Sequence, residues 1–102
     1  MPTYVSLIRF TQYGLTTMKD KGVQRADMVK QHARALGGKL REAYYCLGDY
    51  DVVAVWDFPN NQAAMKAALL NASMGHIQIK TMPAVNRDEW KKVLRATLGK
   101  RK

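Results

Sequence analysis

The sequence predicts an α+β fold of the ferredoxin-like type, with the order β-α-β-β-α-β and one further helix at the C-terminal end. Three observations lead to this prediction. Four short segments are rich in β-branched and aromatic residues, two longer segments between them repeat apolar residues at helical spacing, and glycine, proline or asparagine stands at most junctions. A length of 102 residues suits one domain, so residues 1–102 are expected to form a single unit with a basic tail at residues 99–102.

The first strand is predicted over residues 4–10, and Gly14 follows it as a breaker. A helix is expected from Thr17 onward, because Thr17 and Asp20 have the spacing of a capping box. The two glycines at residues 37–38 end this helix. Its apolar stripe, which should face the sheet, consists of Ala26, Val29, Ala33 and Leu36.

Two strands follow over residues 40–47 and 52–58, joined by Gly48 and Asp49, which tolerate the backbone angles of a tight turn. The second of these strands is apolar at both alternating positions. This pattern predicts a central strand that is covered on both faces.

Asp49, Tyr50 and Asp51 stand at the entrance to the most apolar segment of the chain. Their first interpretation is structural: Asp51 can accept hydrogen bonds from nearby backbone amides, and Tyr50 can bury its ring while its hydroxyl stays in water. The alternative is a place at the mouth of a pocket, where the phenol or a carboxylate contacts a ligand.

Pro59 ends the third strand, and Asn60 or Asn61 can cap a helix over residues 62–74. The stripe expected to face the sheet from this helix consists of Met65, Ala68, Leu69 and Ala72. The fourth strand is predicted over residues 76–82.

Asn86 and Glu89 repeat the spacing of a capping box and predict a final helix that ends near Gly99. Its apolar residues are Trp90, Val93 and Leu94, followed by Thr97. The net charge is +9, and six of the 17 basic residues lie in the last twelve positions: Lys91, Lys92, Arg95, Lys100, Arg101 and Lys102. This block could attract a polyanion, but it lacks interleaved aromatic residues, so a solvated helix and tail are the preferred interpretation.

Two helices on one face of a four-stranded sheet leave the other face bare, and a bare apolar face predicts a homodimer or a larger assembly. With Val5 and Leu7 assigned to the helix side, the bare face would carry Tyr4, Ser6, Ile8, Phe10, Ala54 and Trp56. Two such faces packed together would form a dimeric α/β barrel around an apolar pocket. The candidate ligand-binding residues are Ser6, Tyr44, Tyr50, Trp56 and His76.

The turn residues Gly48, Tyr50 and Asp51, the opening "MPTYVSLIRFT" and the segments "LGDYDVVAVWDFP" and "AAMKAALL" resemble the GYD domain family of small bacterial and archaeal proteins. The resemblance runs from about Pro2 to Trp90. It implies the dimeric α/β barrel fold. It implies no reaction, because relatives by fold include both enzymes and sensing modules.

Several kinds of chemistry lack a motif in this chain. Cys46 is the single cysteine and has no nearby base in sequence, and no ligand spacing for a metal is found, so neither a metal nor a fixed cofactor is expected. The third strand carries no basic residue, which disfavours RNA recognition and makes a nucleic-acid partner unlikely. No signal segment or apolar stretch of about 20 residues is found, so a cytoplasmic location without a membrane partner is expected.

These observations favour a homo-oligomeric domain that binds a small apolar or aromatic molecule, as a sensor or carrier. An enzyme is the alternative: a cofactor-independent monooxygenase or isomerase in which Tyr44, Tyr50 or His76 moves a proton. A third hypothesis is a structural or nucleic-acid-associated assembly that uses the basic tail.

Overall fold

The computed structural model describes residues 1–99 and has the predicted order of strands and long helices, with one additional short helix after the first strand. The sheet has the order β2-β3-β1-β4, and every neighbouring pair of strands is antiparallel. This topology confirms the ferredoxin-like fold. The elements are β1 (Thr3–Phe10), α1 (Gln12–Thr16), α2 (Met18–Ala35), β2 (Lys39–Tyr45), β3 (Val52–Asp57), α3 (Asn61–Ser73), β4 (Ile77–Ala84), α4 (Arg87–Leu94) and the π-helical turn η1 (Arg95–Gly99).

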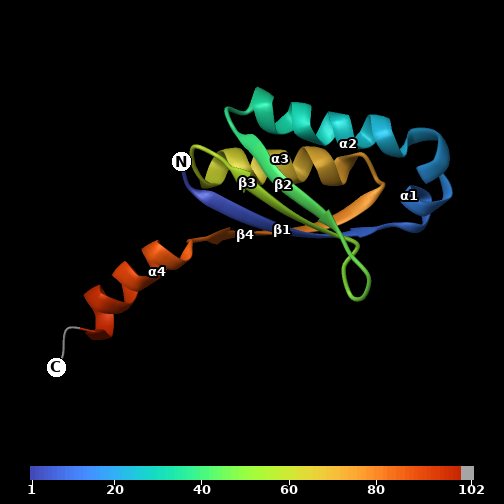
Figure 1. Ribbon diagram of the computed structural model, residues 1–102. Helices are drawn as coiled ribbons and strands as arrows, with labels where there is room; N and C mark the ends of the chain where they lie inside the picture. The colour runs from blue at the N-terminus through green and yellow to red at the C-terminus, as the bar shows by residue number, and fades with distance from the viewer. Residues whose placement is uncertain (100–102) are drawn as a thin grey trace.

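The molecule has two layers and a projecting arm (Figure 1). Helices α2 and α3 lie side by side on one face of the sheet, while α1 turns the chain at the end of β1. The other face of the sheet is covered by no element within residues 1–99. We call it the open face and define it by Val5, Leu7, Val53 and Val55, all of which are partly exposed.

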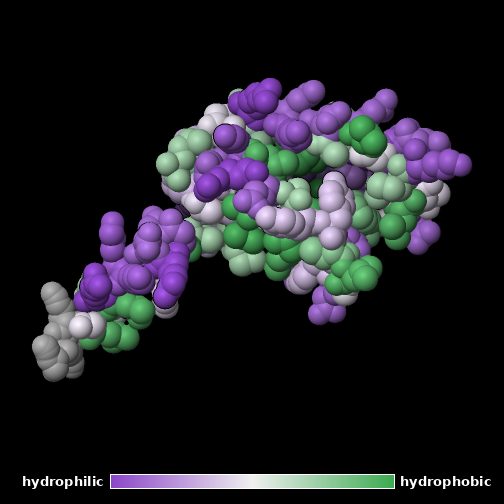
Figure 2. Space-filling model, in the orientation of Figure 1, coloured by the Kyte–Doolittle hydropathy of each residue, from purple (hydrophilic) through white to green (hydrophobic). Residues whose placement is uncertain are grey.

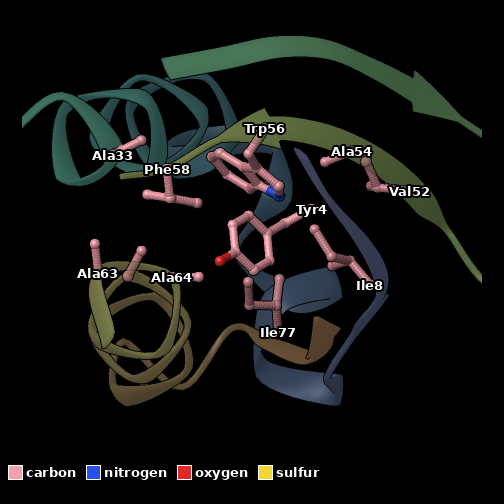
Figure 3. Packing of buried hydrophobic residues seen from close by; sticks show 11 residues of the cluster. Tyr4, Ile8, Ala33, Val52, Ala54, Trp56, Phe58, Ala63, Ala64 and Ile77 are labelled. Atoms are coloured by element: carbon pink, nitrogen blue, oxygen red, sulfur yellow. The ribbon is translucent and has the colours of Figure 1, made fainter. Parts of the chain in front are cut away.

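The core lies between the sheet and the two helices (Figure 3). Tyr4, Trp56 and Phe58 fill its centre, with ring centroids 5.8 Å apart for Tyr4 and Phe58 and 5.7 Å apart for Trp56 and Phe58. Small residues of α3, including Ala63 and Ala64, let this helix approach the large rings closely.

The assignment of strand faces made from the sequence is wrong. Tyr4, Ser6, Ile8, Ala54 and Trp56 face the helices and are buried, whereas the valine and leucine positions between them form the open face. Because β1 and β3 are apolar at both alternating positions, hydropathy alone could not distinguish the two faces. The large aromatic rings determine which face is buried, because only the face that the helices cover is deep enough to bury them.

The first helical region differs from the prediction. The capping box at Thr17 does not form; Thr11 instead caps α1, accepting a hydrogen bond from the Gly14 amide at 3.0 Å. The stripe expected on α2 does face the core, with Ala33 buried and its three partners partly buried. Instead of capping α2, the Thr17 hydroxyl accepts a hydrogen bond from the Arg25 guanidinium.

The stripe predicted for α3 is wrong. Met65 is 69% exposed and Leu69 is 72% exposed, whereas the buried residues of α3 are Ala63, Ala64, Ala67 and Asn71. The reason is steric: the aromatic core occupies most of the space under α3, so small residues face it and bulky ones point outward.

Helix α4 begins with the predicted capping box between Asn86 and Glu89, and both of its hydrogen bonds form. It buries no residue and projects away from the sheet, with hydrophilic and hydrophobic residues on opposite sides (Figure 2). This arm raises the radius of gyration to 15.9 Å, against about 13 Å for a compact chain of similar length. Of the tail predicted at residues 99–102, residues 100–102 lie outside the described residues. Among the helices of residues 1–99, none combines the length and apolar character that crossing a membrane requires.

Candidate functional site

A cavity of about 420 Å³ lies between α2 and the sheet. We call it the α2 cavity. Ile8, Val52 and Trp56 line it from the sheet, and Met18 and Val29 line it from α2. Figure 2 shows hydrophobic side chains beneath the hydrophilic outer row of α2. Its volume falls within the range of about 300–1,000 Å³ that small-molecule pockets occupy.

Arg25 brings a positive charge into this apolar cavity. The side chain is 8% exposed and its guanidinium lies 4.9 Å from the centroid of the Tyr13 ring. Its Nη1 donates a hydrogen bond of 2.5 Å to Thr17 Oγ1. The ring of Tyr13 and the hydroxyl of Thr17, both at the α1 end of α2, thus hold the guanidinium in place.

His76 lines the same end of the cavity, just before β4, and is 5% exposed. Its backbone oxygen accepts the Thr11 amide at 3.0 Å, and a Cβ built on Gly14 would come within 2.1 Å of that oxygen. Gly14 is therefore required for this close contact between α1 and the chain before β4. Within residues 1–99, His76 Nδ1 is buried and has no hydrogen-bond partner.

The electrostatics of His76 follow from this position. Burial, and next the nearby charge of Arg25, lower the pKa of its imidazole below the ordinary 6.5. His76 is therefore neutral at neutral pH, so one ring nitrogen is a proton acceptor and the other a donor.

The exposed rim of the cavity carries two acids and two bases, Asp27 and Glu42 with Lys30 and Arg41. Arg41 among these forms a salt bridge of 3.6 Å with Asp57, which does not line the cavity. Arg25, by contrast, forms no salt bridge within residues 1–99.

The five candidate residues predicted from the sequence do not form one site. Trp56 and His76 both line the α2 cavity. Ser6 is fully buried behind it and accepts the Trp56 indole N–H at 2.8 Å. Tyr44 and Tyr50 line no part of the α2 cavity.

Tyr44 projects on the same side of the sheet as Val53, its partner on β3, and is 57% exposed. Its hydroxyl donates a hydrogen bond to the Glu42 carboxylate, and this bond, followed by the charge of Glu42, raises the pKa of Tyr44. A phenol whose pKa is raised above 10.0 is a poor proton acceptor at neutral pH.

Tyr50, in the turn before β3, has two cations near its ring, one from β1 and one from β4. Arg9 and Lys80 lie 5.5 Å and 5.7 Å from its ring centroid, and Lys80 Nζ donates to its hydroxyl at 3.4 Å. The neighbouring Asp51 accepts the Phe10 amide at 2.8 Å, as its structural interpretation predicted. Gly48 takes the positive φ of 116° that the turn requires.

Sequence reasoning missed Arg25 and Tyr13. A signal for Arg25 was present, because it lies beside Ala26 and four residues before Val29 on the inward stripe of α2. A charged residue inside an apolar helical stripe indicates either a buried partner or a ligand. The chain order gave no comparable signal for Tyr13, whose role depends on the turn between α1 and α2.

The residues that could hold a metal are sparse. Within residues 1–99 no three His, Cys, Asp or Glu side chains group together in a way that could bind a metal ion. Cys46 is a partly buried free thiol whose Sγ lies 3.6 Å from the Tyr44 carbonyl oxygen.

Comparison with known proteins identifies the family. The family model of the GYD domain matches residues 4–94. A search of curated proteins finds no match to the sequence.

Solved structures with the same fold are similar at low sequence identity. The crystal structure of FFRP-DM1 has a TM-score of 0.58 and 18% identity, over 83% of this chain and 100% of that chain. 30S ribosomal protein S6 from Thermotoga maritima has a TM-score of 0.55 and 14% identity, over 93% of this chain and 96% of that chain. The putative chlorite dismutase TA0507 has a TM-score of 0.53 and 16% identity, over 92% of this chain and 48% of that chain. These likenesses support the fold.

Proposed function

This chain belongs to the GYD domain family, and we propose that it is a small-molecule-binding domain whose site is the α2 cavity. The observation that carries this proposal is the cavity itself: about 420 Å³, walled by apolar residues from two layers, with buried polar groups at one end only. An apolar wall with few convergent polar groups is typical of ligand pockets. The proposal moves the site from the space between two sheets to the space between helix and sheet within one chain.

A cavity-filling pair of variants tests this proposal. Ala26 lines the cavity from α2, whereas Ala35 on the same helix is exposed. Ala26→Leu should abolish the rise in melting temperature that small aromatic molecules produce, because the added methylenes occupy their space. Ala35→Leu should leave that rise unchanged. Equal responses of the two variants, or no response of the wild-type protein to any such molecule, would contradict the proposal.

A second copy of this chain is the partner that we propose for the open face. Val5, Leu7, Val53 and Val55 form a continuous apolar surface there, since β1 and β3 are paired neighbours. Face-to-face packing of two such sheets is the arrangement that the sequence predicted as a dimeric barrel. Helix α4 adds a further uncovered apolar surface, where Trp90 is 52% exposed.

Light scattering of the wild-type protein and a Leu7→Asp variant tests the assembly. The wild type should have at least twice the mass of the 11.6 kDa chain at micromolar concentration, and Leu7→Asp should be a folded monomer. Lys19→Asp, a charge change on exposed α2, is the control and should keep the mass. A monomeric wild-type protein would contradict this part of the proposal.

Catalysis is a second candidate function, favoured by one observation: a neutral, buried His76 lines the cavity. In that role its imidazole would accept a proton from an acidic C–H of the bound molecule, as in the predicted isomerase alternative. The measurement is deuterium uptake from D₂O at the carbon of a bound ligand, followed by NMR. Uptake with the wild type and its loss in His76→Gln would support catalysis, whereas binding without uptake supports a sensor or carrier.

A further inference from the structure

At the polar end of the α2 cavity, the guanidinium of Arg25 has no carboxylate partner within residues 1–99. Within residues 1–99, Arg25 donates one side-chain hydrogen bond, to Thr17, although a guanidinium has five N–H donors. The salt bridge found in that part of the chain joins Arg41 to Asp57 instead. A mostly buried positive charge without an opposite charge is unfavourable, so an anion from outside the chain would stabilise it.

His76 supplies an independent second observation. Among the described residues, the fully buried polar side-chain atoms without a partner are Asn71 Nδ2 and His76 Nδ1, and His76 lines the α2 cavity. Nη1 of Arg25 has its partner in Thr17, and no other guanidinium nitrogen of Arg25 is both fully buried and without a partner within residues 1–99. One cation and one neutral imidazole therefore stand at the same end of an apolar cavity.

We propose that the α2 cavity binds a small carboxylic acid, whose carboxylate contacts Arg25 and His76 and whose apolar body lies along Ile8, Val52 and Trp56. The inference rests on the proposed function and adds the class of ligand. A planar guanidinium can offer a carboxylate two parallel hydrogen bonds, and an imidazole N–H can supply a third. One buried positive charge balances a singly charged carboxylate, whereas a phosphate monoester carries up to two negative charges.

Three ligands with a similar apolar body test the ligand class: phenylbutyrate, the neutral phenylbutyramide and phenylpropyl phosphate. Isothermal titration calorimetry of the wild-type protein should show phenylbutyrate binding about tenfold to a hundredfold more tightly than the amide, as expected for hydrogen bonds to a charged group. The phosphate should bind more weakly than the carboxylate. NMR of the His76 ring should show the pKa of His76 rising when phenylbutyrate binds, since a neighbouring carboxylate favours the imidazolium.

Two arginines of α2 provide the matched variants. Arg25→Gln should remove the preference for the acid while the amide binds as before, and Arg34→Gln, on the exposed side, should change neither. Equal affinity of the wild type for acid and amide would overturn the carboxylate inference and leave the proposed function in place. Tighter binding of the phosphate would also overturn it. If none of the three ligands binds, the proposed function and this inference are both overturned. The comparisons among ligands use the wild-type protein, so they test the inference even if Arg25→Gln fails to fold.

Discussion

The indole Nε1 of Trp56 donates a hydrogen bond of 2.8 Å to Ser6 Oγ, and neither side chain is more than 2% exposed. Ser6 Oγ lies a further 2.8 Å from Thr81 Oγ1, so three adjacent strands are joined by side-chain hydrogen bonds under the helices. Two residues predicted to bind a ligand thus satisfy each other. Their polar atoms are occupied by a hydrogen bond inside the core, and Trp56 contributes its ring to the wall of the α2 cavity.

Ser6→Ala should destabilise the protein by about 1–3 kcal/mol, because it leaves the buried Trp56 N–H without an acceptor. Urea unfolding followed by circular dichroism measures the change. Ser73→Ala is the control: Ser73 is exposed at the end of α3, and its loss should alter stability by less than about 0.5 kcal/mol. Equal stability of Ser6→Ala and the wild type would show that the Trp56–Ser6 bond contributes nothing.

Gly14→Ala should be strongly destabilising, since its Cβ would lie 2.1 Å from the His76 backbone oxygen and neither backbone can yield easily. It should also weaken ligand binding, because α1 carries Tyr13 and contacts the chain at His76. Gly22→Ala is the matched comparison: its Cβ meets only the flexible Met18 side chain, so helix propensity should make it neutral or stabilising by up to about 1 kcal/mol. Thermal unfolding measures the stability of both variants, and a Gly22→Ala variant less stable than Gly14→Ala would contradict this reasoning.

Asp51→Ala should cost about 1 kcal/mol, because Asp51 Oδ2 accepts the Phe10 amide where β1 ends. Asp51→Asn keeps an acceptor and should recover most of the loss. Asp49→Ala should have little effect, since the contact of Asp49 with Arg9 is made by its backbone oxygen at 2.6 Å. Chemical denaturation of the three variants separates these cases, and a larger loss in Asp49→Ala than in Asp51→Ala would reverse our interpretation of the turn.

The lowered pKa of His76 predicts a dependence of stability on pH. Well above pH 6.5, the ordinary pKa, the imidazole is neutral in both the folded and the unfolded chain and contributes no difference. As the pH falls below that value, the unfolded chain binds the proton first, so the free energy of unfolding decreases until the folded pKa is passed. Between about pH 7.5 and about pH 5, wild-type protein should therefore lose more stability than His76→Gln. Parallel profiles would show that His76 titrates normally in the folded state.

The sequence by itself determined the order of the elements and several of their ends. Asn60 and Asn86 cap α3 and α4 through bonds to residues three positions later, and Gly37 and Gly48 take positive φ angles where the helix and the turn require them. These are local effects, because each depends on groups only a few residues apart. The Gly48–Asp51 turn belongs to the same class, and so its structural role could be predicted.

The tertiary structure alone decided which face of the sheet is covered and what meets there. Alternation in β1 and β3 allowed either face, and the depth needed to bury Tyr4 and Trp56 settled the choice. The candidate site depends on this choice, because Arg25 of α2 and His76 before β4 reach one cavity only after α1, α2 and the sheet pack together. The spacing of residues in the sequence does not predict that Arg25 and His76 come together, because packing between distant segments brings them to one cavity.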